Sequence, residues 1–501
     1  MIVSCSQMLD GENAAFTRGV SAADLMVEAG RGIFECIRQF YPEPGTAVLY
    51  LGKGNNAGDA LVVAKHLLDA GWKVVARTAA PVESFKDLPA KHWQALEGRV
   101  PLMDDPHRPT TILGPLLLVD GLLGVARASS PLRDTYAELV REMNELRRTR
   151  HASTVAIDLP SGLDVVTGMP GDPCVHADLT VTVAHVKDVL LSDAATRVVG
   201  RLAIAPLPRL DKVDGDLSSR ALTASALLPA LPRRGFDFHK GEAGRVGVVA
   251  GSRGFLGAAI LAASGALRGG AGLITLYVRE EHYALFAQQA PAEVMVKPVS
   301  DYRQVLQENY NVLAVGPGLG RTHEAEVFDL VRQSSKPMVL DADMLNMVAD
   351  GRLGTLESLR APALLTPHPG EMARLLKRMP ELQKVSREEQ VTKLAARYGR
   401  ITWLLKGSRT VIATKGQPIS FNTTGSPGMA TGGMGDVLTG LCAALIAQGV
   451  GMHDAACLGA WLGGRAAEVA LLRGQSEESL TPGDVLANLG AAFTDLKRLV
   501  Y

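Results

Sequence analysis

Short apolar runs alternate with longer amphipathic stretches along the first part of the chain. TAVLYLG (46–52) and LLLVDG (116–121) have the length and composition of buried strands. Between them, DALVVAKHLLDAG (59–71) has the spacing of a helix that ends at Gly71. Strand–helix–strand order predicts a parallel sheet with crossover helices. Further strands are expected at WKVVART (72–78), STVAIDLP (153–160) and DLTVTVAH (178–185).

The alternation stops at one polar segment and then starts again. PLPRLDKVDGDLSS (206–219) is rich in Pro, Asp and Ser, which is typical of a linker or a peripheral segment. A chain of 501 residues is also too long for one ordinary domain. We therefore expect two α/β domains, at residues 1–220 and 221–501. Strands of the second are expected within RVGVVAG (245–251), NVLAVGPGLG (311–320), PMVLDADML (337–345), ALLTPHPGE (363–371) and TWLLKGSRTVIAT (402–414).

Composition narrows the class of protein. Lys+Arg and Asp+Glu both number 52, and a chain without a basic excess is not typical of a nucleic-acid-binding protein. Five cysteines without a CxxC pair argue against a zinc or dithiol site and fit a reducing compartment. The N-terminus lacks the pattern of a signal peptide, and no apolar run reaches the roughly 20 residues of a membrane helix. We expect a cytoplasmic protein with no membrane or nucleic-acid partner.

Polar residues follow the ends of several predicted strands. Ligands of open parallel sheets bind at the carboxyl ends of the strands. Each of these residues alone is explained by turn chemistry or helix capping, but their shared placement indicates ligand sites. They are Asn55, Asn56, Asp120, Asp158, Ser161, His368 and Lys406.

Two glycine-rich turns each open a predicted helix. GKGNNAGDALVVAKHL (52–67) and ATGGMGDVLTG (430–440) both place bare amides at a helix N-terminus, where anions bind. The first turn matches neither Walker A nor the dinucleotide fingerprint. In the second turn, Asp436 is either a helix cap worth about 1 kcal/mol or a general base. As a base it would take a proton from a hydroxyl while the amides hold a phosphoryl group.

Other polar turns also leave alternatives open. Lys406 and Arg409 in LLKGSRT either hold nucleotide phosphates or are solvated charges of a plain hairpin. His368 lies between two prolines and is either a ligand contact or a turn residue. Clustered side-chain oxygens such as those of Asn55 and Asn56 suit a monovalent or hard cation.

The second half resembles the ADP/ATP-dependent NAD(P)H-hydrate dehydratase domain, which has a ribokinase-like α/β fold. The resemblance rests on HKGEAGRVGVVAGS, GALRGGAGLITL, GPGLG, DADMLN, TPHPGEMARLL, LLKGSRTVI and GMATGGMGDVLTG, in this order between residues 230 and 495. It implies that Asp436 is the base and that Mg²⁺ accompanies ADP or ATP. The implied hydrate contacts are Ala258, Gly318, His368 and Asp436, and the implied nucleotide contacts are Lys406, Gly407, Ser408, Arg409, Thr410 and Gly435.

The first half, over residues 10–205, resembles the NAD(P)H-hydrate epimerase domain, a Rossmann-like three-layer sandwich. The resemblance rests on GKGNNAGDALVVAKHL, VDGLLG and IDLPSGLD. It implies that Asp158 is the acid or base and that K⁺ is held by Asn56, Asp120 and Ser161. The implied hydrate contacts are Asn55, Asn56, Ala57, Gly58, Asp59, Gly124, Val125, Ala126, Arg127, Ala128, Ser129, Ser130 and Asp158.

This half departs from the family pattern at two turns. The family's turn is GNNGGDG, and Ala57 and Ala60 stand where two glycines are expected. Its second loop is D-x-L-x-G-T-G, and Val125 and Ala126 stand where Thr and Gly are expected. An alanine held at positive φ would cost about 1 kcal/mol. A binding or dimerisation module is therefore the alternative to an active epimerase.

Together the two resemblances imply an enzyme that repairs hydrated nicotinamide cofactors. The first domain would interconvert the R and S hydrates, and the second would dehydrate the S form at the expense of ADP or ATP. Its partners would be these small molecules and further copies of the chain in a homo-oligomer. The alternative is a ribokinase-like kinase for a vitamin precursor, with a non-catalytic first domain and a stable phosphorylated product.

Overall fold

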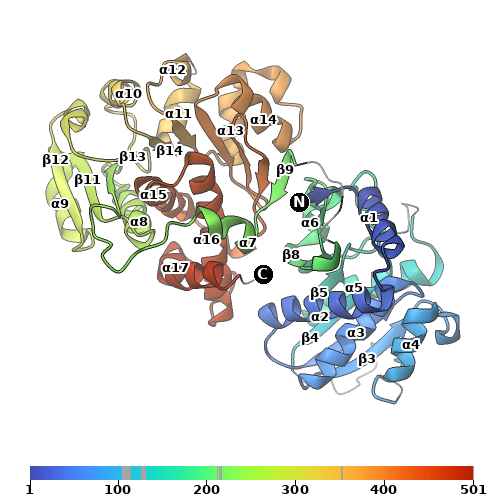
Figure 1. The fold of residues 1–501 in the computed structure, drawn as a ribbon. Helices are drawn as coiled ribbons and strands as arrows, with labels where there is room; N and C mark the ends of the chain where they lie inside the picture. Colours follow the sequence, from blue (N-terminus) through green and yellow to red (C-terminus); the bar gives the residue numbers. More distant parts are fainter. Residues whose placement is uncertain are drawn as a thin grey trace. The chain divides into compact units, whose positions relative to one another are not determined.

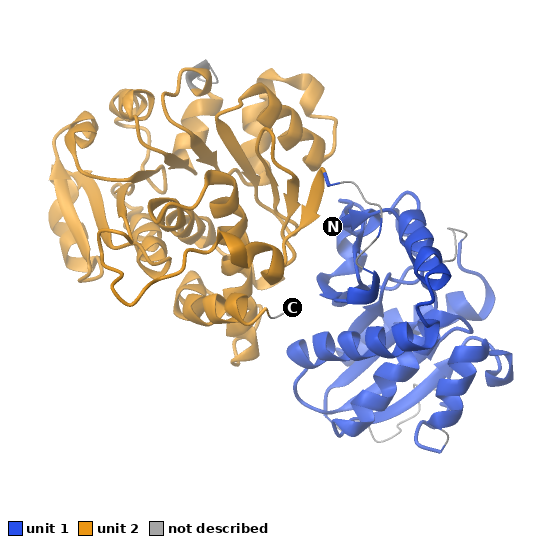
Figure 2. Cartoon of the chain, in the orientation of Figure 1, with its two compact units in different colours: residues 1–217, 501 blue, residues 218–500 orange. Residues whose placement is uncertain are grey.

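The chain forms two compact units, Met1–Leu217 and Ser218–Val500 (Figure 2). The computed structural model describes residues 1–96, 98–103, 114–125, 131–210, 213, 217–350 and 354–499. Each unit is a sheet with helices packed against it (Figure 1). The predicted fold class, two α/β domains with parallel sheets, is confirmed.

Unit 1 contains a six-stranded sheet in which every pair of neighbours is parallel. The strand order is β3-β2-β4-β5-β6-β8. A separate short pair, β1 (Ile2–Val3) and β7 (Val186–Lys187), is also parallel. The strands predicted in this half are all confirmed. The sheet is made of β2 (Thr46–Leu51), β3 (Lys73–Thr78), β4 (Leu116–Gly121), β5 (Ser153–Ile157), β6 (Leu179–Val183) and β8 (Arg201–Ala205).

Both faces of the unit 1 sheet are buried, which gives three layers. In β2, Ala47, Leu49 and Leu51 belong to the core beneath α2 and α3, whereas Val48 and Tyr50 belong to the core beneath α5. Successive strand residues point to opposite faces, so a strand between two helical layers is apolar throughout. The helices are α1 (Cys5–Thr17), α2 (Ala22–Phe40), α3 (Asn55–Asp69), α4 (Asp87–Ala95), α5 (Asp134–Arg150) and α6 (Thr196–Val199).

Unit 2 contains a ten-stranded sheet in the order β12-β11-β10-β13-β14-β15-β16-β17-β18-β9. The strands from β12 to β16 are parallel, β17 is antiparallel to both its neighbours, and β18 pairs parallel with β9. The strands predicted in this half are confirmed. Their bounds are β9 (Ser219–Ala221), β10 (Arg245–Val249), β11 (Leu273–Arg279), β12 (Val294–Val299), β13 (Val312–Val315), β14 (Met338–Leu340), β15 (Ala363–Leu365), β16 (Ile401–Leu405), β17 (Val411–Ala413) and β18 (Ile419–Phe421).

Helices cover both faces of the unit 2 sheet. One layer holds α8, α15, α16 and α17, which pack on one another in that order around the largest apolar core. The elements α10, α11, α13 and α14 lie apart from that layer in Figure 1. The helices are α7 (Ala224–Leu227), α8 (Leu256–Arg268), α9 (Tyr283–Gln289), α10 (Glu324–Gln333), α11 (Asp343–Ala349), α12 (Gly354–Glu357), α13 (Pro369–Leu375), α14 (Arg387–Arg397), α15 (Met434–Ala447), α16 (Met452–Leu472) and α17 (Pro482–Lys497).

Among the described residues, one helix, α16, is long and apolar enough to cross a membrane by length and composition. Its most apolar window is 89% buried within unit 2. The helix therefore has the burial of a core helix, and its apolar sequence is explained by packing on α15 and α17.

The predicted linker is partly packed. Leu207, Leu210 and Val213 are buried in the core of unit 1. The expectation of a peripheral segment is therefore wrong for these three positions, because apolar residues three apart in this stretch pack in the core that includes α1. All five cysteines are free and buried, as expected for thiols that only pack.

Candidate active sites

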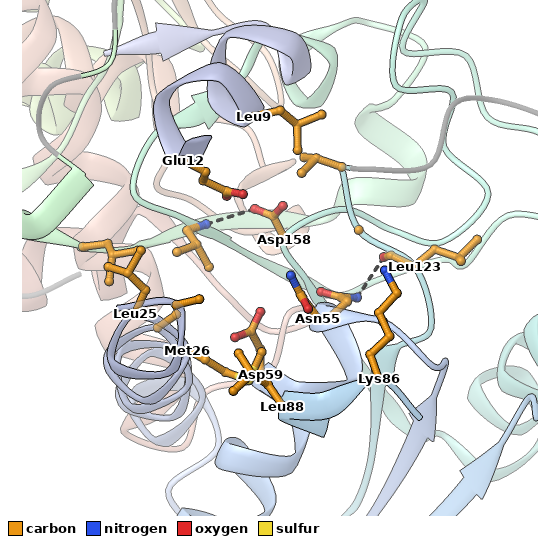
Figure 3. Close-up of a pocket in the computed structure, with 18 of the residues that line it drawn as sticks. Leu9, Glu12, Leu25, Met26, Asn55, Asp59, Lys86, Leu88, Leu123 and Asp158 are labelled. Carbon is orange, nitrogen blue, oxygen red and sulfur yellow. Dashed lines mark hydrogen bonds between the residues drawn. The ribbon is translucent and has the colours of Figure 1, made fainter. Parts of the chain in front are cut away.

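Unit 1 contains a cavity of about 370 Å³ at the carboxyl ends of β4 and β5 (Figure 3). Helices α1 and α2 and the start of α3 complete its wall. Six residues that the sequence predicts to bind a ligand line it. They are Asn55, Asn56, Asp59, Gly124, Val125 and Asp158.

Asp158 lies in this cavity in a strained backbone conformation. Its φ is +65°, a region that non-glycine residues rarely occupy and that is often found at functional sites. Its Oδ1 accepts hydrogen bonds from the Thr182 hydroxyl (3.1 Å) and the Val183 amide (3.1 Å). Within the described part of the chain nothing donates to Oδ2, which leaves that oxygen available to a ligand.

Lys187 is a site residue that sequence reasoning missed. Its side chain is 1% exposed, and Nζ donates to Asp158 Oδ1 at 2.5 Å, to the Thr182 hydroxyl at 3.1 Å and to the Val183 carbonyl at 3.0 Å. These three hydrogen bonds hold the buried amine against one oxygen of Asp158. The only sequence signal was a lysine shortly after the strand at 179–183.

Two more carboxylic acids line the same cavity. Burial raises the pKa of Glu12 to about 7, with the negative charge of Asp158 adding to the rise and Lys187 opposing it. Burial also raises the pKa of Asp59 well above its ordinary value, with Asp158 and Glu12 adding to the rise. Glu12 was not predicted, because a single acidic residue in the first amphipathic helix carries no motif.

The three residues predicted to hold a cation lie together beside the cavity. Asp120 accepts hydrogen bonds from the Ser161 hydroxyl and amide, both at 2.7 Å, and the Asn56 amide group donates to the Leu123 carbonyl at 2.8 Å. Ser161 Oγ also accepts from the Leu123 amide at 3.1 Å. These contacts join the ends of β4 and β5 to the start of α3.

The alanines that replace family glycines are not strained. Ala57 and Ala60 lie inside α3, are absent from the positive-φ positions and are fully buried. The expected cost of about 1 kcal/mol therefore does not arise.

Some predicted hydrate contacts do not line the cavity. Neither Ala57 nor Gly58 is among its lining residues. A Cβ added to Gly58 would lie 2.4 Å from the Met26 sulfur, so this glycine serves the packing of α2 on α3. The predicted residues Ala126, Arg127, Ala128, Ser129 and Ser130 lie outside the described residues.

In unit 2, the predicted residues gather at the carboxyl ends of four adjacent strands. Gly318 follows β13, His368 follows β15 and Lys406 follows β16, while Asp341 follows the intervening β14. The start of α15 joins them, since a Cβ added to Gly435 would lie 3.0 Å from Lys406 Nζ and 3.5 Å from Asp341 Oδ2. Asp341 was missed as a site residue, although it lies in the quoted DADMLN motif.

Asp436 lies in the first turn of α15 and does not act as its cap. The N-cap is Gly433 at φ +97°, and no side chain makes a capping hydrogen bond there. The interpretation of Asp436 as a helix cap is therefore wrong. Burial raises its pKa to about 7, with Asp341 adding to the rise and Lys406 opposing it. A carboxyl group with this pKa is poised to accept a proton near neutrality.

Lys406 supplies the positive charge of this cluster. Its Nζ donates to Asp341 Oδ1 at 2.9 Å and lies 3.9 Å from Glu371 Oε2. Burial lowers the pKa of Lys406, but Asp341 and Glu371 outweigh burial and raise it overall. The other oxygen of Asp341 accepts from the Thr439 hydroxyl at 2.8 Å, which fixes the carboxylate against α15.

The hairpin that carries Lys406 is not a solvated one. The Lys406 side chain is 19% exposed, and Arg409 is 4% exposed. Arg387 Nη2 donates to the carbonyls of Lys406 and Arg409 at 3.2 and 3.1 Å, which holds the turn closed. The interpretation of these residues as solvated charges is therefore wrong. Of the other predicted nucleotide contacts here, Gly407 and Ser408 are exposed, and Thr410 is buried.

His368 is the N-cap of α13. Its Nδ1 accepts from the amides of Gly370 (3.0 Å) and Glu371 (3.4 Å), and Glu371 Oε2 accepts from the His368 amide at 2.8 Å. Burial and then Lys406 lower the pKa of His368, so the ring is neutral at pH 7. Since Nδ1 accepts, the remaining ring proton is on Nε2, which lies 3.5 Å from Glu371 Oε1.

The turn after β13 needs its glycines. Gly316 and Gly318 have φ of +125° and +57°, and a Cβ on Gly316 would lie 1.9 Å from the Asp341 carbonyl oxygen. A Cβ on Gly318 would lie 2.9 Å from that of Ala258. The predicted hydrate contacts Ala258 and Gly318 are therefore neighbours.

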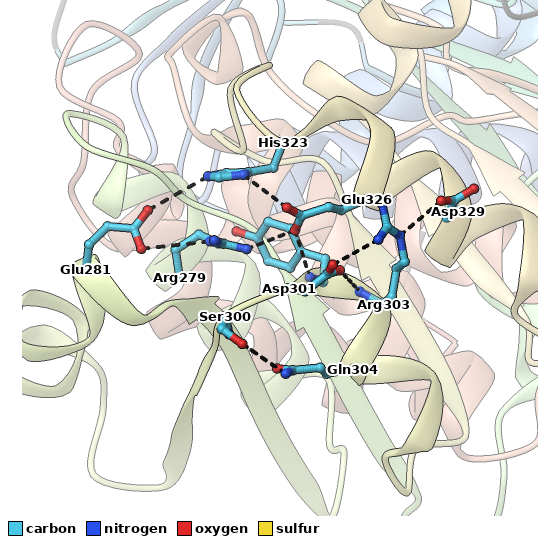
Figure 4. A network of polar contacts seen from close by, with 10 residues as sticks. Arg279, Glu281, Ser300, Asp301, Arg303, Gln304, His323, Glu326 and Asp329 are labelled. Carbon is cyan, nitrogen blue, oxygen red and sulfur yellow. Dashed lines mark hydrogen bonds and ion pairs between the residues drawn. The ribbon is translucent and has the colours of Figure 1, made fainter.

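A polar network anchors the chain beyond this turn (Figure 4). Glu326 accepts hydrogen bonds from Arg279 at the end of β11 (2.9 Å) and from the Tyr302 amide (3.0 Å). His323 lies 3.4 Å from Glu326 and 3.8 Å from Glu281. The charged side chains of this network pair with one another. The network therefore links α10 to β11, and its charges are not available to bind a ligand.

The two sites and two α/β units define a two-domain enzyme, and comparison with known proteins identifies its family. The model of YjeF-related protein N-termini matches residues 22–189, and that of NAD(P)H-hydrate dehydratases matches 246–487. The chain belongs to the family of bifunctional NAD(P)H-hydrate repair enzymes, because it is 36% identical to one from Moorella thermoacetica over 95% of this chain and 93% of that one.

A further curated relative agrees with this assignment. The bifunctional NAD(P)H-hydrate repair enzyme of Escherichia coli is 33% identical over 92% of this chain and 87% of its own. The ADP/ATP-dependent NAD(P)H-hydrate dehydratase of Bacillus subtilis, co-crystallized with ATP/Mg²⁺, is 29% identical with a TM-score of 0.48. It covers 56% of this chain and 100% of that structure.

Proposed function

We propose that unit 1 epimerises hydrated NADH and NADPH and that unit 2 dehydrates their S form at the expense of ADP or ATP. The observation that carries the proposal is Asp436, a partly buried carboxyl group that faces Asp341 and Lys406 at an uncapped helix N-terminus. Full-length similarity to bifunctional repair enzymes supports both activities. The corresponding domains are those predicted at residues 1–220 and 221–501, a division three residues beyond that of the two compact units.

In unit 2, Asp436 would take the proton of the hydrate's hydroxyl group as that oxygen attacks the terminal phosphate of the nucleotide. The bare amides at Gly433 and Gly435 would hold the transferring phosphoryl group. Phosphorylation turns a poor leaving group into a good one. The ring nitrogen then expels phosphate, and loss of a proton restores the reduced nicotinamide. Ala258, Gly318 and His368 would contact the hydrate, and residues 406–410 the nucleotide.

Mg²⁺ fits unit 2 as an ion that arrives with the nucleotide. Asp341 and Glu371 give the site an excess of carboxylates over Lys406. Yet the described residues contain no group of three His, Cys, Asp or Glu side chains that could hold a metal. Mg²⁺ commonly takes one or two carboxylates, with phosphate oxygens and waters completing its shell. When bound it would neutralise charge that develops on the phosphates.

K⁺ fits the oxygen cluster of Asn56, Asp120 and Ser161 in unit 1. Asp120 is fully buried, and no basic side chain of the described residues pairs with it. Burial raises its pKa to about 6 against the hydrogen bonds from Ser161 and Leu122. A monovalent cation would supply the missing charge through oxygen ligands. It would fix the loop of Gly124 and Val125 over the hydrate.

For the epimerase, Asp158 is the acid–base residue and Asn55, Asn56 and Asp59 contact the hydrate. Lys53 and Lys86 line the outer part of the cavity and are exposed, which suits the phosphates of a dinucleotide. The two expectations of a homo-oligomer and of a cytoplasmic location remain predictions.

The test is recovery of the near-ultraviolet absorbance of reduced nicotinamide from mixed R and S hydrates with ADP or ATP and Mg²⁺. Wild type should recover the full signal, Asp436→Asn none, and Asp158→Asn only the S fraction after subtraction of spontaneous epimerisation. A wild type that stalls at the S fraction would show that unit 1 is a binding module. A stable phosphorylated product in place of restored cofactor would identify a vitamin-precursor kinase.

A further inference from the structure

The unit 1 cavity brings together three carboxylic acids and one buried amine from four parts of the chain. Glu12 comes from α1, Asp59 from α3, Asp158 from the end of β5 and Lys187 from β7. Three acids and one buried base in a space of about 370 Å³ cannot all be charged at little cost. Burial accordingly raises the pKa of both Glu12 and Asp59.

Lys187 distinguishes Asp158 from the other two acids by its contacts. Its contact to Asp158 is 2.5 Å, and its other two donors are used by Thr182 and Val183. No hydrogen bond or ion pair joins Glu12 to a basic side chain of the described residues. Lys187 therefore bonds Asp158, whereas burial and the charge of Asp158 raise the pKa of Glu12, which favours its protonated form.

Glu12 is held in place by the elements around it. Strand β1 pairs with β7, and Val3 lies opposite Lys187 in that pair. Helix α1 begins two residues later with a capping box between Ser4 and Gln7. In Figure 3 the carboxyl group of Glu12 points toward Asp158 across the cavity. The same short strand pair therefore positions the amine on Asp158 and the helix that presents Glu12.

We propose that Glu12 is a second catalytic residue of the epimerase site, the acid that works with Asp158 as base. This inference rests on the epimerase function proposed above. A group that donates a proton opposite a carboxylate that accepts one is the pairing that acid–base catalysis requires.

The step is a reversible ring opening. Asp158 takes the proton of the hydroxyl group, the carbon–oxygen bond becomes a carbonyl, and the bond from this carbon to the ring nitrogen breaks. The electron pair of that bond stays on the nitrogen, to which Glu12 gives its proton. After the aldehyde rotates, the nitrogen attacks its other face, Glu12 takes its proton back, and Asp158 returns its proton to oxygen. Both residues end as they began.

The electrostatics of the cavity suit this division. Burial raises the pKa of Glu12 to about 7, Asp158 raises it further and Lys187 opposes the rise. Asp59 on α3 faces the same space, and Lys53 and Lys86 lie at its exposed rim. Epimerisation should therefore weaken as pH rises above about 7, when Glu12 loses its proton.

The experiment follows conversion of purified R hydrate to the S form by the full chain without nucleotide, using chromatography that separates the epimers. Glu12→Gln should lower kcat by roughly 10²-fold or more with little change in KM, and the alkaline decline of kcat should vanish. Asp10→Asn is the matched control, since Asp10 is an exposed acid of the same helix outside the cavity. Circular dichroism spectra and thermal unfolding of each full-length variant check that unit 1 is folded.

Each outcome decides the proposal. The proposal is supported if kcat falls and its decline at alkaline pH disappears in Glu12→Gln but not in Asp10→Asn. Wild-type kcat with an unchanged pH profile in Glu12→Gln would overturn the acid role while leaving the epimerase function intact. A loss equal to that of Asp10→Asn would also overturn it. A wild type that does not epimerise would refute the proposed function of unit 1, and this inference with it.

Discussion

Asp158 and Asp436 show how the same residue type acquires different properties from its neighbours. Asp158 has the ammonium group of Lys187 directly on one oxygen. Asp436 lies near Lys406, but that amine is bonded to Asp341, so burial and neighbouring carboxylates dominate. Both aspartates and Lys406 follow from sequence motifs, whereas Lys187 does not.

At the same scale, His453 predicts a pH dependence of stability. It is 6% exposed, its ring nitrogens contact Thr414 (2.9 Å) and Ser420 (3.2 Å), and burial, followed by Arg220, lowers its pKa to about 4. The unfolded state binds a proton near pH 6.5, so the stability due to neutral His453 is full above that pH and falls as pH decreases toward 4. We expect this difference in proton binding to lower the free energy of unfolding of unit 2 by about 2 kcal/mol between pH 7 and pH 5.

Chemical denaturation of unit 2 at pH 7 and at pH 5 measures this effect. His453→Gln should lose less stability than wild type on acidification, because glutamine does not titrate. His239→Gln is the control, since that side chain is 68% exposed. Equal losses in His453→Gln and wild type would contradict the assignment.

At the scale of elements, α8 and α15 contact through glycines that the apolar pattern does not reveal. A Cβ on Gly440 would lie 1.8 Å from the Ala262 carbonyl oxygen, and one on Gly265 would lie 2.4 Å from that of Val437. These two helices therefore pack backbone against backbone. The contact sets the position of α15, whose first turn carries Asp436.

Gly440→Ala should lower the free energy of unfolding of unit 2 by about 3 kcal/mol, because the added methyl group forces the helices apart. Dehydratase activity should fall as well, since the start of α15 moves. Denaturant titration measures the first effect. Gly463→Ala in α16 is the control, because a Cβ there meets nothing within 4 Å. Unchanged stability in Gly440→Ala would show that the helix contact is looser than described.

For the whole molecule, each unit has a complete sheet and its own apolar core. All strands of the six-stranded sheet lie before Leu217, and all those of the ten-stranded sheet lie after it. The apolar clusters divide in the same way. Leu207, Leu210 and Val213 belong to the first unit, so a division must fall after them.

Residues 1–217 and 218–501, expressed separately, should therefore each fold with a cooperative thermal transition measured by circular dichroism. The first should epimerise the hydrates without dehydrating them, and the second should consume only the S form. A first fragment that ends before Leu207 is the control and should be destabilised. Aggregation of either longer fragment would contradict the independence of the units.

The strands, the helices and the glycine-rich motifs could be predicted from the amino-acid pattern. Buried strands read as apolar runs because both faces of each sheet are covered, and Asp158, Asp436 and Lys406 could be named because they follow such strands or open a glycine-rich helix. The sequence also raised a doubt about Ala57 and Ala60 that α3 removes, since helical backbone accepts alanine without strain.

Which charged side chains contact one another depends on the tertiary structure. Lys187 and Glu12 belong to no motif, and the DADMLN motif does not single out Asp341, because the importance of all three comes from contacts with residues far away in the chain. Lys187 reaches Asp158 only after β6 and β7 are in place, and Lys406 reaches Asp341 only across the sheet. Burial and neighbouring charge, which set proton affinity, are properties of that three-dimensional arrangement.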